Sequence, residues 1–125
     1  MSVSLISTTT NEPNYLVVID EVLIARDIAL TITDQEPEAS VLIASSLTEA
    51  EEALSKVSNL VLAFVNVRPR TFAESALAQA ISKRGGRVVL LGYEAEAVGP
   101  NPLWDVLMQP FDTAAVLARL NRRSA

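Results

Sequence analysis

The apolar and polar positions of the chain alternate between two kinds of segment from residue 15 onward. Short continuous apolar runs are typical of strands buried on both faces of a sheet. Longer segments with apolar residues three or four positions apart are typical of helices that bury one side. The pattern predicts strands over 15–19, 41–44, 60–65, 88–91 and 106–108, each followed by a helix.

Local signals set the expected ends of these helices. Residues suited to capping a helix start are Asp20, Ser46 with Glu49, Thr71 with Glu74, and Asp112. The pair Gly85 and Gly86 is expected to end the third helix, and Pro37 the first. Prolines and a glycine between residues 99 and 102 leave room for only a short fourth helix around 94–98.

Regular alternation of strand and helix predicts an α/β fold. Parallel strands joined by right-handed crossovers place helices on both faces of the sheet. We therefore expect one doubly wound, five-stranded parallel sheet with a short or irregular fourth helix. This flavodoxin-like domain is expected to span residues 15–125, after a polar N-terminal tail at 1–14.

The amino-acid composition of the chain excludes several kinds of ligand and of side-chain chemistry. A chain of 125 residues, half of them hydrophobic, suits one compact domain. Its net charge of -5 disfavours nucleic-acid and anionic-membrane binding, because phosphates are repelled. The chain has no Cys and no His, which removes thiol and imidazole chemistry and the usual zinc ligands. It has neither an apolar run long enough to span a membrane nor a signal-peptide pattern, so we expect a cytoplasmic location.

Functional groups of open α/β sheets gather at the carboxyl ends of the strands. In this chain those ends are Asp20, 64–66, 91–93 and 109–110. A hydroxyl-rich run at 7–11 could suggest a flavodoxin phosphate loop, but it lacks glycine and precedes a strand rather than a helix. No cofactor is therefore expected.

The four strand ends carry a resemblance to the response-regulator receiver family over nearly all of residues 15–123. Val17-Val18-Ile19-Asp20-Glu21 looks like the opening in which two successive acids hold magnesium, with Ile19 in place of the first acid. The segment 59–69 is similar to the third strand and its loop, with Phe64 in the phosphoacceptor position. Leu91 stands where a threonine or serine hydroxyl is expected. Gln109-Pro110-Phe111 resembles the lysine, proline and phenylalanine that close the site, with Gln109 in place of the lysine, and Val106 stands where an aromatic switch residue is expected.

This resemblance implies a receiver whose phosphorylation site has been dismantled. Transfer of a phosphoryl group to a carboxylate needs a nucleophilic oxygen and a divalent cation to neutralise developing charge. Phe64 supplies no such oxygen, and the remaining ligands, Asp20, Glu21 and the carbonyl of Asn66, are a poor magnesium cage. Asp20 is read as a helix cap in preference to a remnant metal ligand. A shifted alignment, in which Asp20 and Glu21 form the acidic pair, stays open.

The first helix is the leading candidate for a partner surface. Its apolar residues extend beyond one face, to Val22, Leu23, Ala29 and Leu30. The resemblance implies docking there by a histidine kinase, a phosphotransfer protein or another regulator, with a homodimer also compatible; a deeply embedded helix is the alternative. Tyr93 and Trp104 could add to such a surface or pack under an irregular loop.

The resulting hypothesis is a non-enzymatic, phosphorylation-incompetent receiver-like protein of a phosphorelay-type pathway that acts by binding another protein. Two alternatives stay open: a receiver-like domain switched by a small ligand in the altered pocket, and a structural subunit of a larger assembly.

Overall fold

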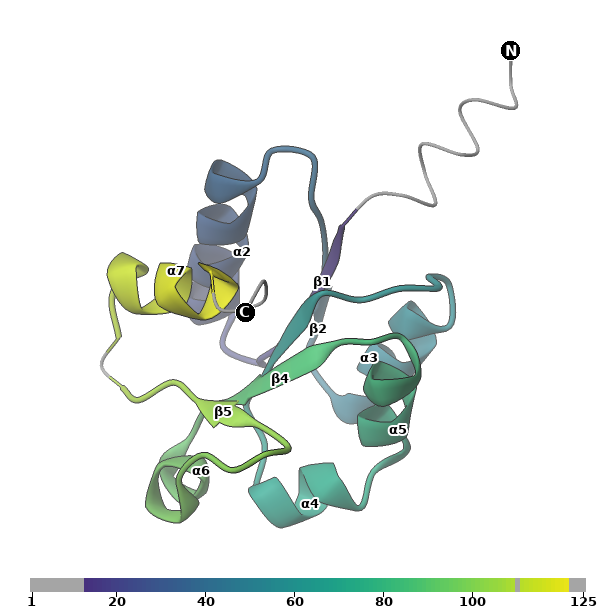
Figure 1. Cartoon of the computed structure of the whole chain (residues 1–125), viewed down its shortest axis with the longest axis vertical. Coiled ribbons are helices and arrows are strands. Elements are labelled where there is room, and N and C mark those ends of the chain that lie inside the picture. The colour runs from purple at the N-terminus through teal and green to yellow at the C-terminus, as the bar shows by residue number, and fades with distance from the viewer. Residues whose placement is uncertain (1–12, 110, 122–125) are drawn as a thin grey trace.

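The computed structural model describes residues 13–109 and 111–121. These residues form one five-stranded parallel sheet in the order β2-β1-β3-β4-β5, with helices on both faces (Figure 1). The elements are β1 Asn14–Val18, α2 Val22–Gln35, β2 Ser40–Ala44, α3 Leu47–Leu54, β3 Leu62–Val65, α4 Pro69–Ala73, α5 Ala76–Lys83, β4 Arg87–Leu90, α6 Tyr93–Val98, β5 Asp105–Val106 and α7 Thr113–Asn121.

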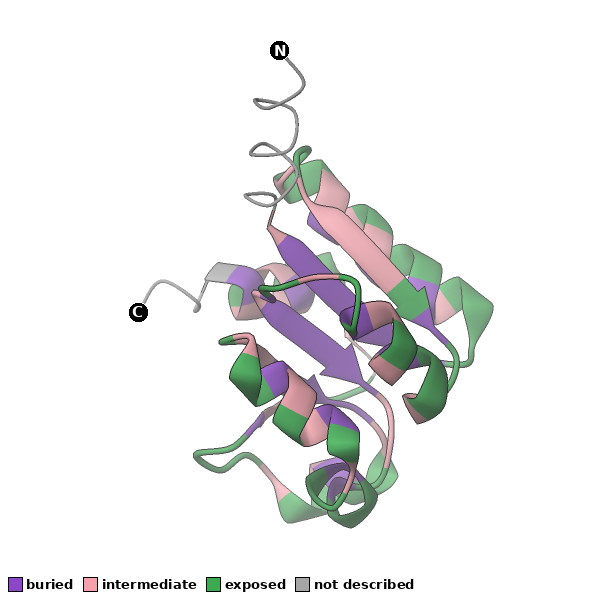
Figure 2. Cartoon of the chain, turned by 90° about the vertical axis from the view of Figure 1, so that its right-hand side faces the viewer, coloured by how far each residue is buried: buried purple, intermediate pink, exposed green. Residues whose placement is uncertain are grey.

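The sheet separates two hydrophobic clusters. Odd-numbered positions of β1, such as Tyr15 and Val17, face α2 and α7, whereas Leu16 and Val18 face the side covered by α3, α4 and α5. This division follows from the two-residue period of a strand. Because both faces are covered, β1, β3 and β4 are almost entirely buried (Figure 2). The near-continuous apolar strands predicted from the sequence are explained by this arrangement.

Most element boundaries agree with the sequence pattern. The strand β1 begins at Asn14, the last residue of the expected tail, and residues 1–12 of that tail lie outside the described residues. The strands β3 and β5 are shorter than predicted, and α6 is a short helix as expected. Gly85 has φ of 76° and follows α5, which fits the predicted glycine stop.

The predicted caps have mixed outcomes. Ser46 caps α3 by accepting a hydrogen bond from the Glu49 amide at 3.2 Å. The Glu49 carboxylate accepts hydrogen bonds from the Ser45 amide and hydroxyl, which lower its pKa. Asp112 accepts a hydrogen bond from the Ala115 amide at 3.0 Å, as expected for a cap of α7.

Two predicted caps are wrong. Pro69 occupies the first turn of α4 with the preceding Arg68 extended, so this helix starts before Thr71, and a second helix starts after Ser75. The Thr71 and Glu74 pair therefore forms no capping box. Asp20 is also not the cap of α2, because Glu21 holds that position and makes no side-chain capping bond.

The short edge strand β5 is attached to the last helix through Arg119. Its guanidinium donates a hydrogen bond from Nη2 to the Val106 carbonyl at 2.7 Å, and its Nε lies 3.4 Å from a carboxylate oxygen of Asp105. Arg87 of β4 in turn donates a hydrogen bond to the Arg119 carbonyl at 3.2 Å. Both members of the ion pair are largely buried, so a network of charged groups holds α7, β5 and β4 together.

Candidate functional site

The crevice between β1 and β3 lies where the strand order reverses. The chain runs from β1 to β2 on one side and then returns to place β3 on the other side of β1. In open α/β sheets this switch point, at the carboxyl edge, is the usual ligand position. The candidate site is therefore built from the residues that follow β1, β3, β4 and β5.

Phe64 does not lie at this edge. Its ring is completely buried in the cluster beneath α2 and α7, and β3 continues beyond it to Val65. Leu91 and Ile19 belong to the same cluster and are almost fully buried. These three predicted site residues thus lie together, but in the core.

Asn66 is the first polar side chain after β3, and it lies next to the end of β4. A Cβ atom at Gly92 would come within 2.9 Å of the Asn66 side-chain oxygen. Gly92 has φ of 113°, a backbone conformation that residues other than glycine rarely adopt. The edge between β3 and β4 is therefore formed by Asn66 and Gly92, which lie within the predicted strand ends 64–66 and 91–93, and not by Phe64 and Leu91. The sequence signal for Gly92 was a glycine placed directly between a strand and a helix.

A cleft of about 470 Å³ opens at the same edge between α2 and α6. It is lined by Ile24, Asp27, Tyr93, Glu96, Gln109 and Phe111. The Glu96 carboxylate accepts a hydrogen bond from the backbone amide of Gln109 at 2.9 Å, and this bond holds the backbone in place just before Pro110. Sequence reasoning missed Glu96, and Pro110 itself lies outside the described residues.

The electrostatics of this cleft favour a cation or a neutral ligand over an anion. Two carboxylates, Asp27 and Glu96, line it, and no Lys or Arg is among the lining residues. Asp20 and Glu21 are exposed at the end of β1. Within 13–109 and 111–121, no three acidic side chains gather into a group that could hold a metal ion. No described helix is long and apolar enough to cross a bilayer.

The side chains of the predicted partner surface on α2 differ in exposure. Val22 and Leu23 are each 74% exposed and Leu30 is 51% exposed, whereas Ala29 is half-buried. Tyr93 is 92% exposed. Of the two alternatives for Trp104, the structure supports packing in the core and not the partner surface. Its ring packs edge-on against Phe72, and its Nε1 donates a hydrogen bond to the Gly99 carbonyl.

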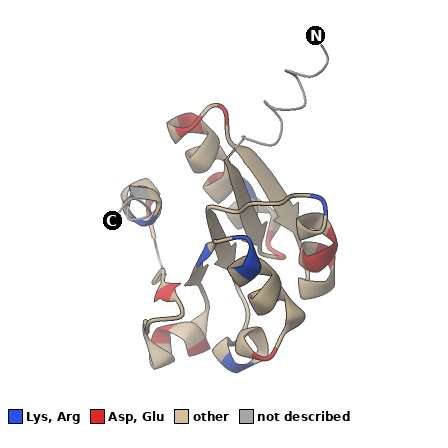
Figure 3. Ribbon diagram, turned by 45° about the vertical axis from the view of Figure 1, so that its right-hand side comes forward, with Lys and Arg blue, Asp and Glu red and all other residues tan. Residues whose placement is uncertain are grey.

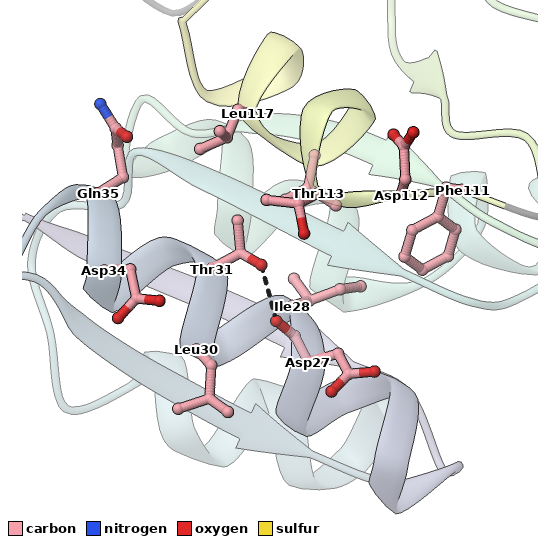
Figure 4. A pocket seen from close by; sticks show the side chains of 11 residues that line it. Asp27, Ile28, Leu30, Thr31, Asp34, Gln35, Phe111, Asp112, Thr113 and Leu117 are labelled. Carbon is pink, nitrogen blue, oxygen red and sulfur yellow. Dashed lines mark hydrogen bonds between the residues drawn. The ribbon is translucent and has the colours of Figure 1, made fainter.

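A groove of about 480 Å³ runs between α2 and α7 beside this surface (Figure 4). Apolar side chains from both helices, including Ile28, Val116 and Leu117, form part of its lining. Three carboxylates, Asp27, Asp34 and Asp112, also line it. The groove combines an apolar surface with a negative rim.

The sequence matches no protein-family model and no curated protein. Solved structures are similar in fold. A response regulator receiver domain protein of Bacillus halodurans has a TM-score of 0.68 at 15% identity, covering 90% of this chain and 97% of its own. The chemotaxis response regulator CheY4 of Vibrio cholerae has a TM-score of 0.65 at 20% identity, covering 90% and 99%.

A third similar structure, a response regulator receiver protein of Sinorhizobium medicae, has a TM-score of 0.60 at 23% identity, covering 90% of this chain and 98% of its own. The agreement extends over nearly the full length of each chain. The chain therefore has the fold of response-regulator receiver domains.

Proposed function

We propose that this protein is a receiver-like signalling protein that does not accept a phosphoryl group and acts by binding another protein. One observation carries the proposal: residues 53–73 contain no Asp and no Glu. This span includes all of β3 and the loop after it. Whether Phe64, Val65 or Asn66 is taken as the acceptor position, no carboxylate is available there.

The charges at the carboxyl edge support the same proposal. A transferred phosphoryl group brings negative charge that needs a cation to stabilise it. Gln109 is neutral, and the nearby cleft is lined by Asp27 and Glu96 without a Lys or Arg. The edge would repel a phosphate, and we propose that the protein is not an enzyme.

The exposed side of α2 and the groove beside it support the binding role. Exposed apolar side chains next to a groove are a common feature of protein interaction sites. Leu23 and Leu30 supply the apolar contacts, and Asp27 and Asp34 supply a negative rim. By its fold, the expected partner is a histidine kinase, a phosphotransfer protein or another regulator of a phosphorelay.

Incubation with acetyl phosphate and magnesium, followed by intact mass spectrometry, tests the first half of the proposal. We expect an unchanged mass under conditions that fully label an intact receiver run in parallel. A stoichiometric, base-labile gain of one phosphoryl group would overturn it. Binding of candidate kinases and phosphotransfer proteins by calorimetry tests the second half, with a variant altered at Leu23 and Leu30 as the control for the surface.

A second candidate function is a receiver-like domain switched by a small ligand, and the cleft at the carboxyl edge favours it. Its mixture of apolar and acidic lining suits a neutral or cationic molecule. Native mass spectrometry of the purified protein would reveal such a molecule as a fixed added mass that disappears on denaturation. Recovery of a stable hetero-assembly without any signalling partner would instead favour a structural subunit.

A further inference from the structure

The edge strand β2 has hydrogen-bonding groups that point away from the sheet. The Ser40 amide donates to the Pro13 carbonyl at 2.9 Å, and the Ala44 carbonyl accepts from the Ile19 amide at 3.1 Å. In a parallel ladder, alternate residues of a strand bond to the same neighbour. Ser40, Leu42 and Ala44 therefore bond to β1, and the backbone groups of Val41 and Ile43 face outward. Within the described residues, β1 is the one strand that pairs with β2.

This edge lacks the features that normally protect a free strand. Natural edge strands carry charged residues, prolines or bulges that discourage pairing with another chain. The sequence of β2, Ser-Val-Leu-Ile-Ala, contains no charge and no proline, and its five residues pair with β1 in unbroken register. An additional strand would meet no charged side chain on β2 itself.

Apolar side chains flank the edge. Ile43 is 54% exposed, and its side chain lies on the same face as Val41, which packs against the cluster beneath α2. One side of α2 lines the groove between α2 and α7. At 3.6 residues per turn, Val22 and Ala29 lie on the opposite side of α2, toward β2. An added strand could therefore bury Ile43 and Val22 as well as bond to the backbone.

The charges of the segments around β2 are mostly negative. Residues 27–55, with β2 at their centre, contain Asp27, Asp34, Glu36, Glu38, Glu49, Glu51 and Glu52 and no Lys or Arg. Arg26 and Lys56 border this span, and Arg26 lies on the same side of α2 as Val22 and Ala29. These acids lie on α2, on α3 and in the turn before β2 (Figure 3). A second copy of this chain would bring the same negative field against itself.

We propose that the β2 edge binds an extended segment of another protein, in which a short β-branched or apolar stretch is flanked by Lys or Arg. The segment adds a sixth strand beside β2, a recognised mode of peptide recognition. Backbone bonds to Val41 and Ile43 supply affinity, and the acidic surroundings select basic flanks. The proposal concerns a different surface from the α2 and α7 groove and does not depend on the phosphorylation state.

Amide hydrogen exchange of the protein alone tests the geometry. We expect slow exchange at Leu42 and Ala44, whose amides bond to β1, and fast exchange at Val41 and Ile43. Slow exchange at Val41 and Ile43 in dilute protein would mean that the edge is already covered. Protection that grows with protein concentration would mean that a second copy is the occupant. Either result would overturn the proposal.

A peptide with alternating valine and threonine at its centre and two lysines at each end is the binding probe, followed by fluorescence anisotropy. We expect binding that weakens with salt and protects the Val41 and Ile43 amides. The twin peptide ending in glutamates should not bind, nor should a lysine version methylated at alternate backbone nitrogens. Equal binding of the lysine and glutamate peptides, or no binding of either, would contradict the proposal.

Two variants make the test specific to the edge. Ile43→Lys removes the apolar contact of the Ile43 side chain and places a positive charge against the lysine peptide, so it should weaken binding of that peptide at least about ten-fold. Leu103→Lys introduces the same charge at an exposed leucine away from β2, 71% exposed, and should bind like the unaltered chain. If both variants bind equally well, the peptide binds elsewhere. Thermal melts of both variants establish that each is folded.

Discussion

Asn66 and Gly92 form the contact that defines the carboxyl edge between β3 and β4. Gly92 is needed for its backbone conformation, and its missing side chain leaves space for the Asn66 amide. Gly92→Ala should destabilise the fold by ~1–3 kcal/mol, the usual cost of holding another residue in such a conformation. Chemical denaturation measures the loss.

The two causes can be separated. If crowding by Asn66 contributes, adding Asn66→Ala should recover part of the loss, because the Asn66 oxygen is the atom that a Cβ at Gly92 would meet. If backbone strain acts alone, the two changes should be additive. Gly99→Ala is a matched control: its φ is 83° but a Cβ there would meet no neighbouring atom within 4 Å. A stable Gly92→Ala protein would contradict the role given to this glycine.

Phe64 has a structural role, and replacing it with aspartate should reveal that role as a loss of stability. Phe64→Asp removes a fully buried ring, for which truncation alone typically costs ~3–5 kcal/mol, and puts a carboxylate in an apolar cluster. We expect severe destabilisation and no phosphorylation. Asn66→Asp is the contrasting variant, since it is nearly isosteric at a half-buried edge position. It should fold normally and still remain unphosphorylated, because Gln109 supplies no cation. A stable, phosphorylatable Phe64→Asp protein would overturn this account of the site.

At the scale of elements, α2 has one buried side and an exposed apolar side. Leu23→Ser with Leu30→Ser should leave the free energy of unfolding within about 0.5 kcal/mol, because both side chains are largely exposed, while weakening association with a partner. Light scattering and thermal melts of the double variant measure these effects. Ile28→Ser, at a fully buried position of the same helix, is the control that should unfold the protein. Severe destabilisation of the double variant, or undiminished partner binding, would exclude this side of α2 as the docking surface.

The network around Arg119 gives a second prediction at this scale. Arg119→Ala should destabilise the protein by about 1.5–3 kcal/mol, since a hydrogen bond to a charged group is lost in a largely buried place. Arg70→Ala is the matched control, because its ion pair with Glu74 is exposed and should contribute almost nothing. Equal effects of the two changes in thermal denaturation would mean that the Arg119 network does not hold β5.

At the scale of the whole molecule, the sequence predicted the architecture well because strand burial has a clear pattern. Runs such as 16–19 and 88–91 are apolar at every position, which is typical of strands covered on both faces. The order of the strands, β2-β1-β3-β4-β5, was not predicted and comes from the structure. The apolar pattern of a single sequence does not show which strands lie next to each other in the sheet.

The candidate site was predicted less well, for reasons that can be named. Periodicity does not show where a strand stops, so the predicted strand ends 64–66 and 91–93 included Phe64 and Leu91, which lie in the core, as well as Asn66 and Gly92, which form the edge. The acid Glu96 reaches the Gln109 amide across thirteen positions, a contact that local patterns do not contain. Trp104 was undecided between surface and core, and only its packing against Phe72 resolves it.

The attachment of β5 by α7 has a consequence for synthesis of the protein. Domains fold from the N-terminus as the chain leaves the ribosome. Because β5 has only two residues and relies on Arg119, the β4 side of the sheet stays open until the chain through residue 119 has emerged. Nascent chains stalled before that point would hold most of the strands yet expose the apolar residues of β4, and chaperones that recognise such surfaces would compete with completion of the fold.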